Sequence, residues 1–135
     1  MSETSKELMR RFVDEVWNKK NRQIVYEVLT PDFRHYMPGS KDPLIGPEAY
    51  QQAVDFFFMA FPKGKMNIDE VFAEGGRVCL LYTFTGIHEA NFNGIEATNR
   101  KLEFSGVGIG RISEGKIEEI VSIFDNASLF AALAN

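Results

Sequence analysis

The spacing of apolar residues changes at Pro62, and this change limits the folds open to the 135-residue chain. Before Pro62, apolar residues recur every three or four positions, which is typical of amphipathic helices. After it, they alternate with polar residues, which is typical of strands with one buried face. Helices followed by a run of strands indicate an α+β domain in which helices cover one face of a curved sheet.

Turn residues separate the expected elements. We expect helices over residues 5–19, 22–29 and 47–61, strands over 66–74, 78–89, 101–113 and 116–125, and a closing helix over 126–133. Residues 32–46 are expected to form a loop, because Pro38-Gly39 interrupts them. The length suits a single domain over residues 1–135.

Composition and charge exclude several classes of protein. The net charge is −4, with 15 basic and 19 acidic residues, so we expect no nucleic acid partner, which would require a basic surface. No apolar run is long enough to cross a membrane, and we expect no membrane partner. The N-terminal segment is polar and lacks a signal-peptide pattern, which favours a cytoplasmic location.

The sequence contains no recognisable motif for a metal or an organic cofactor, and we expect neither. Its two histidines, His35 and His88, show no metal-ligand spacing. Gly106, Gly108 and Gly110 alternate on one face of a predicted strand, but no helix follows, which excludes a dinucleotide-binding loop. Glycines at this spacing leave the strand face bare, so the backbone can bend or another group can approach it closely.

Aromatic residues are abundant, with 12 Phe, 4 Tyr and 1 Trp. They can form an ordinary packed core or the wall of a pocket for a flat organic ligand. We expect a small apolar or aromatic ligand. The candidate substrate-binding residues are His35, Tyr36, Phe57, Phe61, Tyr82, Phe84, Phe104 and Val121.

Asp125 and His88 are the candidate catalytic residues. Asp125 ends the last predicted strand in phase with Ile117, and apolar neighbours on that face would raise its pKa and make it a general base. Asp125 also stands where a helix cap belongs, and the pattern alone favours the cap. His88 continues an apolar strand face and can transfer a proton or bind a ligand carbonyl, although core histidines bonded to backbone are more common.

A series of short motifs runs through nearly the whole chain: Val16-Trp17-Asn18, Pro31-Asp32-Phe33, Gly46-Pro47-Glu48, Ala60-Phe61-Pro62, Gly86-Ile87-His88-Glu89, Phe92-Asn93-Gly94, Ala97-Thr98-Asn99-Arg100 and the segment 111–117, with Asp125 beyond. Their order and spacing resemble the SnoaL-like polyketide cyclases of the nuclear transport factor two-like superfamily. This resemblance implies a cone of curved sheet and helices around one pocket. It also implies a homodimer or higher homo-oligomer, and ring closure by intramolecular aldol condensation without metal or cofactor.

The same resemblance assigns roles to single residues. Asp125 matches the acid/base aspartate of the family, and His88 matches the histidine of its Gly-Thr-His segment. Val121 replaces a tryptophan that many relatives carry, which implies a smaller or reshaped pocket wall.

These expectations leave two classes of small-molecule function open, beside a scaffold or subunit that acts through the exposed sheet face. The first is an enzyme that performs proton transfer or aldol-type cyclisation on a small carbonyl compound, with Asp125 as base. A hydrolase or dehydratase of the same fold is its enzymatic alternative. The second is a non-catalytic protein that binds a small molecule in the same pocket. An apolar outer face with Cys79, Leu81 and Ile87 predicts a homodimer in either case.

Overall fold

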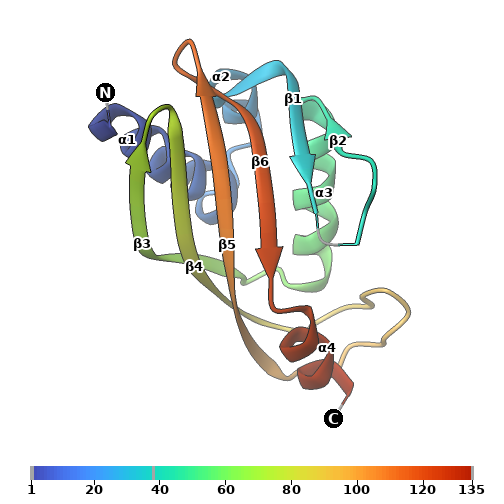
Figure 1. The fold of residues 1–135 in the computed structure, drawn as a ribbon. Coiled ribbons are helices and arrows are strands. Elements are labelled where there is room, and N and C mark those ends of the chain that lie inside the picture. Colours follow the sequence, from blue (N-terminus) through green and yellow to red (C-terminus); the bar gives the residue numbers. More distant parts are fainter. Residues whose placement is uncertain (1, 38, 135) are drawn as a thin grey trace.

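The computed structural model describes residues 2–37 and 39–134. Its six strands form one sheet in the order β2-β1-β6-β5-β4-β3, with helices over one face (Figure 1). The strands are β1 (Leu29–Tyr36), β2 (Leu44–Ile45), β3 (Lys65–Glu74), β4 (Arg77–Ile87), β5 (Lys101–Ser113) and β6 (Lys116–Phe124). The expected α+β fold with a curved mixed sheet is confirmed.

The helices are α1 (Ser2–Phe12), α2 (Val25–Val28), α3 (Pro47–Ala60) and α4 (Asn126–Ala134). A π-helical segment, η1 (Val13–Asn18), continues α1, and a 3-10 turn, η2 (Arg22–Ile24), precedes α2. Within the described residues, no helix is both long and apolar enough to cross a membrane.

Residues 32–36 and 44–45 of the expected 32–46 loop lie in strands β1 and β2, so the loop prediction is wrong at both ends. Strand β1 pairs in parallel with β6 and antiparallel with β2. Its alternating residues Phe33 and His35 are buried and contact Tyr50 of α3 through their rings. Pro38-Gly39 suggested a loop, whereas pairing with β6, far along the chain, stabilises the extended backbone of β1.

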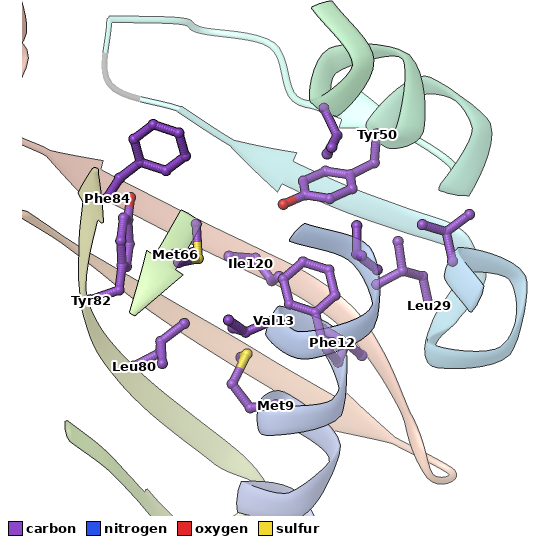
Figure 2. Packing of buried hydrophobic residues seen from close by; sticks show 14 of the residues in the cluster. Met9, Phe12, Val13, Leu29, Tyr50, Met66, Leu80, Tyr82, Phe84 and Ile120 are labelled. Atoms are coloured by element: carbon purple, nitrogen blue, oxygen red, sulfur yellow. The ribbon is translucent and has the colours of Figure 1, made fainter. Parts of the chain in front are cut away.

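The core lies between the sheet and the helices. We call the helix-covered face of the sheet the inner face; it carries Leu80, Tyr82 and Phe84 of β4 and Ile120 of β6. Figure 2 shows these side chains packed with Met9 and Phe12 of α1 and with Tyr50 of α3.

Helix α3 begins at Pro47, whose fixed φ suits a first helical turn. Gly46 precedes it with φ 94°, a left-handed conformation that favours glycine. Along α3, Tyr50, Val54 and Phe57 recur every three or four residues, so they share the side that faces the sheet. Helix α3 therefore covers part of the inner face.

Candidate functional site

A cavity of about 130 Å³ lies between the inner face of the sheet and helices α1 and α3. Apolar and aromatic side chains form most of its wall, and Met37 contributes to it from the end of β1. Among the described residues, the wall contains no Asp, Glu, Lys or Arg. An apolar cavity of about 150 Å³ can hold benzene, so this space is close in size to one aromatic ring.

A histidine and a serine form the polar end of the cavity. His35 of β1 and Ser122 of β6 lie on neighbouring parallel strands, with 2.9 Å between Nε2 and Oγ. Burial lowers the pKa of His35 to about 4, so the imidazole is neutral at pH 7. Its Nδ1 is buried and has no hydrogen-bond partner in the described part of the chain.

Two phenols add uncharged donors to the wall. Trp17 Nε1 donates a hydrogen bond of 3.0 Å to the Tyr50 hydroxyl, and the Tyr50 ring meets the His35 ring edge-on at 5.0 Å. Figure 2 shows Tyr50 reaching from α3 toward the sheet. Burial raises the pKa of Tyr50 well above its usual range and that of Tyr82 to about 12. Both hydroxyls therefore stay protonated at neutral pH and can donate to a ligand oxygen.

The structure brings five of the candidate substrate-binding residues into the wall: His35, Phe57, Tyr82, Phe84 and Phe104. That they contact a ligand stays a prediction. Phe61 is fully buried but lies outside the wall, against Phe57 and Phe84 at ring-centroid distances of 4.8 and 6.2 Å.

Tyr36 and Val121 also lie outside the wall. Tyr36 follows His35 in β1, and Val121 precedes Ser122 in β6. Because successive side chains of a strand point to opposite faces, both residues point away from the cavity. Their candidate role in the pocket wall is therefore not supported by their position.

Asp125 does not open into the cavity, contrary to the expectation from sequence. The Ser128 backbone N–H donates to Asp125 Oδ1 at 2.9 Å, and the Ser128 hydroxyl donates to Oδ2 at 2.6 Å. These two bonds lower the pKa of Asp125, the reverse of the rise that an apolar pocket would cause. Asp125 is exposed and caps α4, which is the alternative that the residue pattern favoured.

A bulge in β6 explains why Asp125 points outward. Strand β5 pairs regularly with β6 except at Glu118, which has no partner on β5. One extra residue reverses the alternation of side chains beyond it. Ile117 is buried before the bulge, but after it Ser122 and Phe124 face inward. The sequence analysis assumed that side chains alternate without interruption from Ile117 to Asp125. It therefore predicted that Asp125 faces the cavity, whereas the bulge turns it outward.

His88 is fully buried but does not line the cavity, so it does not meet Asp125 or a shared ligand space. The Thr98 backbone N–H donates to His88 Nδ1 at 3.2 Å, and the Thr98 hydroxyl lies 3.0 Å from the same atom. The His88 backbone also bonds to Asn99 and Arg100. These contacts hold together the two ends of the loop between β4 and β5, as expected for a core histidine.

Sequence reasoning missed Ser122, Tyr50, Trp17 and Gly108 as wall residues. A signal for Ser122 was present, because this hydroxyl stands between Ile120 and Phe124 on one apolar strand face. Among the described residues, no group of three or more His, Cys, Asp or Glu side chains is placed to hold a metal ion.

Solved structures share this architecture. A proposed SnoaL-like polyketide cyclase from Jannaschia sp. CCS1 superposes with a TM-score of 0.91 at 21% identity, covering 98% of this chain and 93% of that chain. AclR, a proposed hydroxylase from Streptomyces galilaeus, gives a TM-score of 0.87 at 22% identity, with coverages of 99% and 87%. IdmH, a proposed polyketide cyclase from Streptomyces antibioticus, gives 0.85 at 22% identity, with 98% and 99% covered. These similarities show a shared fold.

A comparison with curated proteins found no match to this chain. The family model for SnoaL-like polyketide cyclases, however, matches residues 7–133, which include every strand of the sheet and the whole cavity wall. Because this match covers most of the chain, the chain belongs to the SnoaL-like polyketide cyclase family.

Proposed function

We propose that the protein binds a small, uncharged aromatic carbonyl compound and transfers a proton at the carbon next to the carbonyl. The observation that carries this proposal is the His35–Ser122 pair at the polar end of an otherwise apolar cavity. Proton removal at that carbon is the first step of aldol-type ring closure. The family to which the chain belongs supports this class of reaction.

In the proposed step, His35 acts as the base. When Nε2–H donates to Ser122 Oγ, Nδ1 carries the lone pair, and it has no competing partner among the described residues. The C–H electron pair moves into the carbon framework to give an enolate, and Nδ1 takes the proton. The enolate and the imidazolium attract each other strongly in an apolar site. We expect Tyr50, a neutral donor whose ring meets that of His35, to bond the enolate oxygen.

For ring closure, the enolate carbon attacks a second carbonyl carbon of the same molecule. A carbon–carbon bond forms, and the electron pair of that carbonyl moves to its oxygen. The imidazolium returns its proton to this oxygen, so no external oxidant, reductant or leaving group is needed. The cavity supports the enolate by excluding water and by presenting fixed hydrogen-bond donors.

Exchange of hydrogen for deuterium tests this function without knowledge of the natural substrate. Acetophenone has one ring and one carbonyl with exchangeable neighbouring protons. Incubated in D₂O with the protein, its methyl protons are expected to exchange faster than in buffer alone, as followed by proton NMR. An exchange rate equal to the buffer rate, with bound acetophenone demonstrated in the same sample, contradicts the proposed catalysis.

A non-catalytic binding protein is the second candidate function. The observation that favours it is the lack of any carboxylate in the described part of the wall, because His35, whose pKa burial lowers to about 4, is then the proton acceptor available there. A hydrolase or dehydratase of the same fold has less support, since the polar groups of the wall are few and pair with one another.

We also propose that the protein is a homodimer built on the outer face of the sheet. Two adjacent rows of paired residues make an apolar surface there, the outer patch: Phe72, Cys79, Ile109 and Val121, then Leu81, Val107 and Ile123. Ile123 is 62% exposed and Phe72 54% exposed. Large exposed apolar surfaces mark interaction sites.

Sedimentation velocity at micromolar concentration is expected to show a dimer. Ile123→Asp places a charge at a highly exposed position of the outer patch and should shift the protein to monomer. Met59→Asp, at a 71% exposed position on α3, should leave the dimer intact. A wild-type protein that sediments only as a monomer contradicts the proposal.

A further inference from the structure

The three alternating glycines of β5 are not equivalent in the folded protein. A Cβ at Gly106 would lie 2.4 Å from the Tyr82 hydroxyl oxygen, and one at Gly110 would lie 2.9 Å from Met9 Cε. The protein's own side chains therefore fill the space over both. A Cβ at Gly108 would meet nothing nearer than Ile120 Cγ2, at 3.7 Å, an ordinary contact distance. Gly108 is also the one of the three that lines the cavity.

Gly108 lies directly beside the polar end of the cavity. In the sheet it pairs with Leu80 on one side and with Ser122 on the other. Opposite residues of antiparallel strands have Cα atoms about 4.5–5.5 Å apart. A group resting on Gly108 is therefore one strand away from the Ser122 hydroxyl, which bonds His35.

We propose that Gly108 is the seat for the flat face of an aromatic ring, and that it selects planar ligands for this cavity. Carbon atoms pack best at about 3.5–4.0 Å, so a ring can lie against a bare backbone at that distance. Any side chain would push the ring away by roughly the length of a carbon–carbon bond, about 1.5 Å. A ring on Gly108 directs an oxygen substituent toward Ser122 and His35.

Glycine in a strand has a second common use, which is to let the sheet bend. The surroundings of Gly108 argue against that use, because a Cβ there has ordinary contacts. Gly108→Ala is therefore expected to fold with a thermal midpoint at least equal to that of the wild type. Gly106 does not share this tolerance, because a Cβ there would lie 2.4 Å from the Tyr82 hydroxyl oxygen.

The inference rests on the proposed function. Binding of two neutral ketones can test the ring seat separately from that function. Acetophenone is flat, whereas 2-hexanone is a slender flexible chain. In calorimetric titrations, Gly108→Ala should weaken acetophenone binding by about tenfold and leave 2-hexanone binding within about twofold. Gly108→Val should weaken acetophenone further. Ser105→Ala, an exposed change on the same strand, is the control and should match the wild type.

The outcomes distinguish failure of the ring seat from failure of the proposed function. Equal acetophenone affinity in the wild type and in Gly108→Ala overturns the ring seat and leaves the cavity function standing. A Gly108→Ala protein with a lowered thermal midpoint assigns Gly108 to sheet curvature and overturns the ring seat as well. A folded wild type that binds neither ketone overturns the proposed function together with the seat.

Discussion

Replacing His35 with Phe is expected to lower the rate of acetophenone exchange by about 10²–10⁴, the usual contribution of a positioned acid or base. Phe keeps the ring contact with Tyr50 but has no nitrogen to accept the proton. Ser122→Ala removes one hydrogen bond to His35, worth about 0.5–1.5 kcal/mol, so its rate should fall only about threefold to tenfold. Proton NMR in D₂O measures the acetophenone exchange rate with the wild type, His35→Phe and Ser122→Ala.

Asp125→Asn is the matched control for His35→Phe. Asn is also a favoured helix cap, so the variant should keep both its stability and the wild-type exchange rate. A large loss of rate in Asp125→Asn, with His35→Phe unaffected, would contradict the assignment of the base. The exchange rate should also be level from pH 8 to pH 5 and fall as pH drops through about 4, where His35 becomes protonated.

Phe61→Ala is expected to destabilise the fold by about 3–5 kcal/mol, the usual cost of removing a large buried aromatic side chain. Phe61 is fully buried at the end of α3. Its ring contacts those of Phe57, Phe92 and His88, with centroids 4.8, 5.2 and 5.6 Å away. Its loss would leave a cavity beneath the loop that His88 holds.

Equilibrium unfolding in urea, followed by the fluorescence of Trp17, measures this cost. Trp17 is the single tryptophan of the chain and lines the cavity wall, so its signal reports on the core. Met59→Ala, only two residues earlier but 71% exposed, should change the free energy of unfolding by less than about 0.5 kcal/mol. If Phe61→Ala and Met59→Ala lowered the free energy of unfolding by similar amounts, the assignment of Phe61 to the core would be contradicted.

Most of the fold was predictable because its elements are long and strongly periodic. Helix α3 and strands β3 to β6 each show a periodic spacing of apolar residues, which can be recognised without knowing their distant contacts. Strand β1 was missed because its stability depends on β6, whose paired residues lie 85 to 88 positions further along the chain and are not part of the local pattern. The parallel pairing of these two strands is also what brings His35 to Ser122.

The candidate site was predictable only in its apolar part. Phe84 and Phe104 lie on apolar strand faces, and the alternation of apolar and polar residues was enough to predict that they face the cavity. The orientation of Asp125 was predicted wrongly because Glu118 has no pairing partner on β5. This bulge reverses which side chains of β6 face the cavity beyond that point. Bulges of this kind depend on the neighbouring strand and leave little trace in sequence.

Imidazole NMR of the two histidines during an acetophenone titration tests the central claim most directly. The chain contains only His35 and His88, so the two rings can be assigned by a single substitution. At pH 7, the ring signals of His35 should be those of a neutral imidazole and should shift as ligand is added, while those of His88 stay in place. Movement of the His88 signals with unchanged His35 signals would contradict the proposal that ligand binds at the His35–Ser122 end of the cavity.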